Sequence, residues 1–248
     1  MCQLANAQSA TDYFEQAYAK SEAGQYKEAI QLYTKAIELK PDYADAYFNR
    51  GDAYKILNEY QNAIKDYTKD IELIPDDADA YNNRGISYRN LKDYQAAIKD
   101  YTKAIELKPN YANVYYNRGN TYDDLKDYQA AIKDFVKVIK LKPDYASAYD
   151  NLGYIYLKKG IFDSTMQSFS KCLQLDPKNW DATLGLALVY FQKKNMQSAR
   201  KYLSMASTIE PRLKEGMAGI KKLESEGWNY SDDEKQLLKQ LFKKIKIK

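Results

Sequence analysis

A five-residue motif recurs along the chain at a fixed interval of 34 residues. The segment YFNRG at 47–51 returns as YNNRG at 81–85, as YYNRG at 115–119 and, more loosely, as YDNLG at 149–153. Units of this length tile the sequence in the ranges 10–43, 44–77, 78–111, 112–145, 146–179 and 180–213. A period of this size predicts small identical modules that stack in a row, because no single module could bury its own apolar face.

The residue columns of the units predict two helices per module. Large residues recur at positions four, eleven and twenty-four, and small residues recur at positions eight and twenty. This spacing places the large and small residues on one face of a first and a second helix. Position thirty-two is always proline, which ends the second helix before the next unit begins. These prolines are Pro41, Pro75, Pro109, Pro143, Pro177 and Pro211.

The pattern resembles that of the tetratricopeptide repeat (TPR) family. The departures are modest, since Tyr replaces the usual Trp at position four and Arg replaces Leu at position seven of three units. The resemblance implies an all-α fold, a right-handed superhelical α-solenoid of stacked antiparallel helix pairs. It also implies that the first helices line a concave side. Residues 1–9 then form an N-terminal segment, and residues 214–248 form C-terminal capping and amphipathic helices.

The C-terminal part departs from the repeat. Residues 212–226 are predicted to form one polar helix that covers the last apolar face, and Gly227 ends it. Ser231 and Glu234 form a capping-box pattern before a final helix. The sequence leaves open whether this helix packs on the array or contacts a partner or a membrane surface. Its apolar side comprises Leu237, Leu238, Leu241, Phe242 and Ile245.

Composition argues against most other classes of function. The chain has no histidine and only two cysteines without metal-ligand spacing, so imidazole catalysis and the usual zinc sites are unavailable. Nothing supports an enzyme, a metal site or a cofactor. The formal net charge of +4 resides in residues 212–248, so the repeats are neutral and nucleic acid is not an expected partner. No apolar run is long enough for a transmembrane segment.

The N-terminus carries a weak targeting signal. Ala5, Asn6 and Ala7 resemble the end of a secretory signal peptide. The protein is exported if this segment is a signal remnant, and otherwise cytoplasmic; the sequence leaves both open.

Two positions of the unit switch together. Where position seven is arginine, position twenty-three of the same unit is aspartate, and where one is absent the other is absent too. We therefore expect ion pairs that join the two helices of a unit, because an arginine buried without a partner would be costly. Shared ancestry of these units is the alternative explanation. The predicted pairs are Arg50 with Asp66, Arg84 with Asp100, and Arg118 with Asp134.

Four asparagines at position six are the candidate functional residues: Asn49, Asn83, Asn117 and Asn151. This position lies off the core columns, and asparagine is a mediocre helix former, so neither packing nor propensity explains it. Inheritance by duplication is the alternative. The row is similar to the asparagine ladder in the TPR domain of O-GlcNAc transferase. That resemblance implies that the side-chain amides grip the main chain of an extended peptide.

The neighbouring concave positions would set specificity. They are rich in apolar and acidic residues, so we expect an apolar or basic protein segment as the ligand. The predicted peptide-binding neighbours are Phe48, Asp52, Asn82, Ile86, Arg89, Tyr116, Asn120, Asp150 and Tyr154. The same reasoning places Asp181, Leu184 and Leu188 in this groove. The sequence thus predicts a non-enzymatic peptide-binding scaffold. The alternative is an assembly component that acts through its convex face or C-terminal helix, including self-association.

Overall fold

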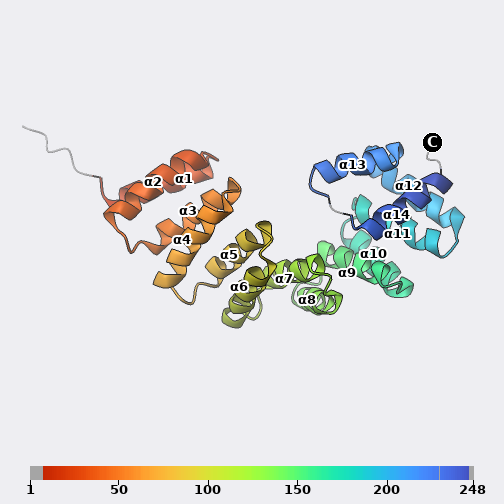
Figure 1. Ribbon diagram of the computed structural model, residues 1–248, viewed down its shortest axis with the longest axis horizontal. Coiled ribbons are helices and arrows are strands. Elements are labelled where there is room, and N and C mark those ends of the chain that lie inside the picture. Colours follow the sequence, from red (N-terminus) through yellow and green to blue (C-terminus); the bar gives the residue numbers. More distant parts are fainter. Residues whose placement is uncertain (1–7, 229, 246–248) are drawn as a thin grey trace, which may run out of the picture. The chain divides into compact units, whose positions relative to one another are not determined.

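The computed structural model describes residues 8–228 and 230–245, and this part of the chain contains helices and no strand (Figure 1). The first helices of the repeats are α1 (Ala10–Glu22), α3 (Ala44–Ile56), α5 (Ala78–Asn90), α7 (Ala112–Asp124), α9 (Ala146–Lys158) and α11 (Trp180–Gln192). The second helices are α2 (Tyr26–Leu39), α4 (Tyr60–Leu73), α6 (Tyr94–Leu107), α8 (Tyr128–Leu141), α10 (Phe162–Leu175) and α12 (Met196–Ile209). The first helices begin where the 34-residue units begin, and the repeated proline follows each second helix by two residues.

The chain forms two compact units, one up to Lys126 and one from Asp127 onward. In the first unit, α1 packs on α2, α3 on α4 and α5 on α6, and each pair packs on the next. In the second unit, α9 packs on α10 and α11 on α12. The fourth repeat is divided between the units, since α7 belongs to the first and α8 to the second.

The core of each repeat is a large side chain at position twenty-four. Tyr67 and Tyr101 in the first unit and Phe169 in the second are fully buried. The glycine at position eight makes room for these rings: a Cβ at Gly85 would stand 2.8 Å from the Tyr101 ring. The two helices of the repeat can therefore approach each other more closely than a larger residue would permit.

A left-handed residue turns the chain between the two helices of each described repeat. Position fifteen has φ between 60° and 73° in the repeats where it is described. Glycine adopts this conformation without strain, but three of these residues are lysines, for which it is costly. The residues are Gly24, Asn58, Lys92, Lys126, Gly160 and Lys194.

The segment after the last repeat differs from the prediction of one helix over residues 212–226. A 3-10 helix, η1 (Pro211–Glu215), precedes a separate helix, α13 (Met217–Ser225). Gly216, with φ of 62°, interrupts the helical path between them. The break folds α13 back on η1, so that a Cβ at Gly219 would clash with the carbonyl oxygen of Arg212 at 1.8 Å. The prediction was wrong because helix propensity alone does not reveal this glycine-mediated contact.

The last helix, α14 (Asp232–Lys244), begins with the predicted capping box between Ser231 and Glu234. Leu238 and Leu241 on its apolar side are fully buried within the second unit. The alternative in which this apolar face docks on a partner is therefore wrong for these residues, because the repeats of the same unit already cover them. None of the described helices is long and apolar enough to cross a membrane.

Candidate peptide-binding surface

Three of the four ladder asparagines, Asn49, Asn83 and Asn117, lie in the first unit on α3, α5 and α7. Each is partly exposed, as expected for residues outside the core. Because α3 contacts α5 and α5 contacts α7, the three side chains come from neighbouring first helices. Asn151 on α9 is also partly exposed but belongs to the second unit, so its place in one continuous ladder stays a prediction.

The amides form hydrogen bonds between the repeats. Asn117 Nδ2 donates to Asn82 Oδ1 over 3.0 Å, and Asn82 Nδ2 donates to Asn83 Oδ1 over 3.1 Å. Asn83 Nδ2 donates to Asp52 Oδ1 of the preceding repeat, again over 3.1 Å. Asn49 instead donates to the carbonyl oxygen of Asp45 one turn earlier on its own helix. Helix periodicity within one repeat could not predict this chain of hydrogen bonds, because the bonds link neighbouring repeats.

The chain of amides ends on the carboxylate of Asp52. The hydroxyl of Tyr67 donates to Asp52 Oδ1 over 2.6 Å, and Lys55 Nζ lies 2.7 Å from the same oxygen. One carboxylate oxygen thus accepts from the core of its repeat, from its own helix and from the next repeat. Asp52 was predicted to contact a peptide, and this stays a prediction. In the structure, Asp52 accepts a hydrogen bond from Asn83 and so holds that amide in place.

The prediction that Asn82 binds a peptide was wrong. Its side chain is only 6% exposed, because it lies between Asn83 and Asn117 and bonds to both. It is therefore not accessible to a peptide, in contrast to its predicted role. The amides that remain at the surface still have hydrogen-bonding capacity. An amide can make four hydrogen bonds, and within the described residues Asn49, Asn83 and Asn117 each make one or two.

The other predicted neighbours in the first unit are partly exposed. Phe48 packs edge-on against Tyr67 with ring centroids 5.8 Å apart. Ile86 packs against the core of the third repeat. Tyr116 and Asn120 lie on α7 with the amide of the fourth repeat. Arg89 Nε donates to Asp124 of the next repeat over 2.8 Å.

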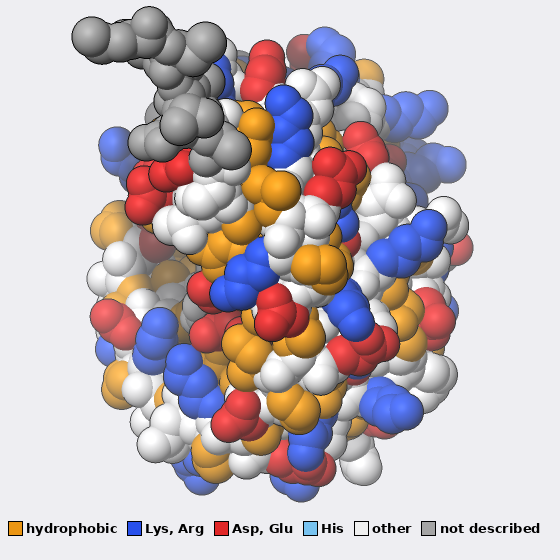
Figure 2. Space-filling view, turned by 90° about the vertical axis from the view of Figure 1, so that its left-hand side faces the viewer, with side chains coloured by type: hydrophobic (Ala, Val, Ile, Leu, Met, Phe, Trp, Pro, Cys, Tyr) orange, Lys and Arg blue, Asp and Glu red, His pale blue; other side chains and the backbone are white. Residues whose placement is uncertain are grey.

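The concave positions of the first unit carry an excess of acid. The two bases at these positions, Lys55 and Arg89, are both neutralised, by Asp52 and by Asp124. Exposed acids such as Asp45 remain beside the amides. Figure 2 shows acidic, basic and apolar side chains interspersed on the face that it presents, with no continuous basic area.

In the second unit, some of the residues that were predicted to line the groove are buried. The hydroxyl of Tyr154 donates to Asp181 Oδ1 over 2.9 Å, and the hydroxyl of Tyr230, from the C-terminal segment, donates to the same oxygen over 3.2 Å. Asp181 is buried, which raises its pKa to about 7. Burial also raises the pKa of Asp150, whose Oδ1 has no hydrogen-bond partner among the described residues. Asp181 is therefore bonded inside the unit and does not line an open groove, whereas Asp150 and Tyr154 are partly exposed and their peptide-binding role stays a prediction.

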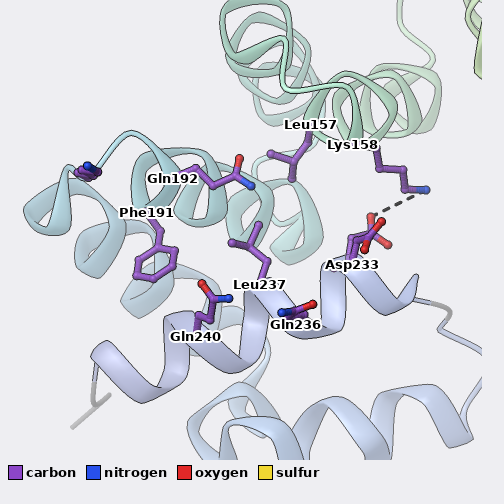
Figure 3. A pocket seen from close by; sticks show the side chains of 10 residues that line it. Leu157, Lys158, Phe191, Gln192, Asp233, Gln236, Leu237 and Gln240 are labelled. Carbon is purple, nitrogen blue, oxygen red and sulfur yellow. Dashed lines mark ion pairs between the residues drawn. The ribbon is translucent and has the colours of Figure 1, made fainter.

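The C-terminal helix explains this correction. Leu184 and Leu188, predicted to line the groove, are fully buried in one cluster with Leu238 and Leu241 of α14. The chain thus covers the concave positions of its own last repeat. A hollow of about 550 Å³ remains beside α14, with residues of α9, α11 and α14 around it (Figure 3). Lys158 and Glu234 approach to 3.9 Å at its edge.

The predicted ion pairs of the second and third repeats are present. Arg50 donates from Nε and Nη2 to the two oxygens of Asp66, each over 2.7 Å. Arg84 bonds to Asp100 in the same bidentate way over 2.7 and 2.8 Å. Each pair is largely buried and joins the two helices of one repeat. Arg118 and Asp134 fall in different units, so their pairing stays a prediction.

A threonine completes each arginine site, which the residue columns within one repeat did not predict. The remaining nitrogen, Nη1, of Arg50, Arg84 and Arg118 donates to the hydroxyl of Thr34, Thr68 and Thr102, respectively, over 2.9 to 3.0 Å. Each threonine belongs to the preceding repeat, so Arg50 and Arg84 each join three helices. The signal was present across the unit boundary, since threonine at position twenty-five precedes each repeat with arginine at position seven.

The described side chains form no cluster of metal ligands. No group of three or more His, Cys, Asp or Glu residues suited to a metal ion occurs among them. Cys172 is buried in the core of the fifth repeat, and burial raises the pKa of its thiol to about 12. Ala5, Asn6 and Ala7 lie outside the described residues.

Comparisons with known proteins agree with the fold. A family model described as "TPR repeat" matches residues 17–57 and 51–91, and models described as "Tetratricopeptide repeat" match residues 78–111, 112–145 and 156–214. Among curated proteins no sequence matches the chain.

Solved structures of the same architecture cover most of the chain. A crystal structure of MamA is 30% identical, with a TM-score of 0.63, and the match covers 65% of this chain and 95% of that one. YrrB, described as a TPR protein with an unusual peptide-binding site, is 24% identical over 77% of this chain and 97% of that one, with a TM-score of 0.63. PilF from Pseudomonas aeruginosa is 20% identical, covers 88% and 97%, and has a TM-score of 0.71. The repeat models and the MamA match together show that this chain belongs to the tetratricopeptide repeat family.

Proposed function

We propose that the protein is a non-enzymatic scaffold that binds an extended segment of a partner protein along the first helices of its first unit. The family supports a protein-interaction role in general. The observation that carries the finer proposal is the row of partly exposed amides on α3, α5 and α7, of which those on α5 and α7 are held in place by hydrogen bonds between repeats. Side-chain amides can donate to and accept from a peptide main chain, whatever the peptide sequence.

The spacing of the amides suits an extended chain. Neighbouring helices lie about 8–10 Å apart and a strand rises about 3.3 Å per residue, so one amide meets roughly every third peptide residue. The three amides of the first unit would therefore span roughly seven to ten residues. Each hydrogen bond contributes about 0.5–1.5 kcal/mol net, so micromolar affinity, roughly 8 kcal/mol, also needs the apolar and charged contacts of the surface.

The acidic concave positions of the first unit favour a peptide ligand with basic residues. Lys55 and Arg89 are already paired, whereas exposed acids such as Asp45 are not paired with a base in the described structure. Lysine or arginine in the ligand would gain favourable interactions there, and acidic residues would be repelled. Phe48 and Ile86 offer apolar contacts between the amides. The preferred ligand is a basic segment with apolar residues.

Selection from a random ten-residue peptide library on the immobilised protein tests this proposal. The expected result is enrichment of Lys, Arg and apolar residues with depletion of Asp and Glu. Enriched peptides should bind at least ten-fold more weakly to the variant N83A/N117A, and with unchanged affinity to N110A, which alters an exposed turn asparagine. Equal binding to the double variant would instead favour an assembly role through another face, including self-association.

A further inference from the structure

A second hollow, of about 560 Å³, lies in the second unit between α8, α9 and α10. Its volume falls within the usual range of ligand pockets. It is separate from the amide row of the first unit. Its lining consists of Ile139, Tyr149, Leu152, Tyr156, Ser164, Gln167, Ser168, Ser170, Lys171 and Gln174.

The 34-residue period identifies this place in the other repeats. Leu152 and Ser168 occupy positions seven and twenty-three of the fifth repeat, where Arg50 and Asp66 stand in the second. Tyr149 and Tyr156 occupy positions four and eleven, as tyrosines do in the second and third repeats. The hollow therefore lies where the guanidinium and carboxylate of the earlier repeats are found.

In those repeats the arginine fills the space. Its guanidinium carbon lies 5.6 Å from the ring centroid of Tyr47 in the second repeat, and the corresponding distance from Arg84 to Tyr81 is 5.4 Å. It also bonds to the aspartate and to the threonine of the preceding repeat. The fifth repeat lacks all three members of this network at once, because Leu152, Ser168 and Val136 replace arginine, aspartate and threonine.

The loss of the arginine, aspartate and threonine changes which side chains the hollow can bind. Lys171 is the one charged residue in the lining, and it contacts Gln174. A basic side chain that entered would lose its hydration without meeting an acid, so it would be disfavoured. Leu152, Ile139 and the two tyrosine rings offer apolar contact, and the serine and glutamine side chains can bond to an adjoining main chain.

We propose that this hollow is a docking pocket for an uncharged aliphatic or aromatic side chain of a partner protein. The occupant replaces the arginine that the earlier repeats supply from within. Its chemistry differs from that of the ligand of the first unit, because the pocket lacks acidic residues. The two sites therefore recognise different segments, and either can fail without the other.

Nuclear magnetic resonance titration of the full chain with capped amino acids tests the proposal. N-acetyl-leucinamide and N-acetyl-phenylalaninamide should give saturable shifts at Tyr149, Leu152 and Ser168, whereas N-acetyl-argininamide should bind at least ten-fold more weakly. The variant V136T/L152R/S168D rebuilds the network of the earlier repeats and should reduce the affinity of both apolar probes at least ten-fold. Circular dichroism checks that the variant is folded.

A second variant covers the case in which the rebuilt network does not fold. Ser168→Leu fills the pocket with an apolar side chain and introduces no charge, and it should weaken binding of the probes to the same extent. The proposal is overturned if neither apolar probe gives saturable shifts, if the arginine probe binds equally well, or if a folded variant binds both apolar probes as the wild type does. The peptide selection on the first unit is scored independently of these outcomes.

Discussion

At the scale of single residues, the repeats provide internal controls for one another. Residues at the same position share a backbone environment, so a difference in behaviour can be assigned to the partner of one side chain. Position twenty-four shows this well. Tyr67 donates to Asp52, whereas the hydroxyl of Tyr101 is buried without a hydrogen-bond partner among the described residues, because Ile86 replaces the aspartate.

Tyr67→Phe should therefore lower stability, whereas Tyr101→Phe should not. Loss of a hydrogen bond to a carboxylate should cost about 1–2 kcal/mol in the free energy of unfolding for Tyr67→Phe. Removal of an unpaired buried hydroxyl should leave stability unchanged or raise it by about 1 kcal/mol for Tyr101→Phe. Urea unfolding monitored by circular dichroism gives both values. An equal loss in the two variants would mean that Asp52 does not stabilise the native state through Tyr67.

Asp70 predicts a pH dependence of the first unit. It is 1% exposed, at a position where the first and third repeats have alanine, and its Oδ2 has no partner among the described residues. Burial, with further contributions from Asp77 and Asp45, raises its pKa to about 7. The folded state therefore keeps a proton that the unfolded state loses. Stability should decrease as pH rises from about 4 to about 7, at up to roughly 1.4 kcal/mol per pH unit, and level off above.

Asp70→Ala tests this dependence. The variant should be more stable than the wild type at pH 8, on the order of 2 kcal/mol, and the two should converge toward pH 4. Hydrogen exchange of α4 amides at several pH values reports the stability of this region. A variant that is less stable than the wild type at pH 8 would contradict the account.

At the scale of elements, the sequence predicted the helices well and the turns and caps less well. Periodicity locates Ala44 and Ala78 as helix starts because the same columns recur in every unit. The left-handed turn residue was not predicted, since the lysine found there in three repeats gives no signal for φ above zero. The break at Gly216 was missed for a similar reason, because it serves a contact between η1 and α13.

The left-handed lysines are sites where glycine should stabilise the protein. Lys92→Gly should raise the free energy of unfolding by up to about 1 kcal/mol, because glycine adopts this φ without steric cost. The control Lys99→Gly, at an exposed position within α6, should lower it by about 1 kcal/mol. Thermal unfolding of the two variants provides the comparison, and destabilisation by both would refute the strain at Lys92.

The cap helix α14 is expected to be part of the core of the second unit. Leu238→Ala should cost about 2–5 kcal/mol in the stability of this unit, because the side chain is fully buried. The control Gln240→Ala, on the exposed side of the helix, should change it by less than about 0.5 kcal/mol. Hydrogen exchange of α11 amides measures the effect. Little change in Leu238→Ala would show that α14 is not a structural cap.

At the scale of the whole molecule, the chain divides its concave positions between two uses. The partly exposed amides of the first unit remain at the surface, whereas Tyr154 and Asp181 in the second are bonded to each other and to the segment before α14. The sequence could place all these residues on first helices, because that follows from their column in the repeat. It could not reveal that Leu184 and Leu188 are covered, since this depends on how a segment outside the repeats packs.

In the proposed complex, the amides of the first unit hold the main chain of a peptide. The most direct measurement is the affinity of one selected peptide and of its backbone N-methylated form, which has the same side chains but fewer N–H donors. Titration by fluorescence anisotropy should show that N-methylation weakens binding to the wild type about ten-fold and changes binding to N83A/N117A by less than two-fold. An equal loss on both proteins would contradict the claim, because the peptide N–H groups would then not be bound through Asn83 and Asn117.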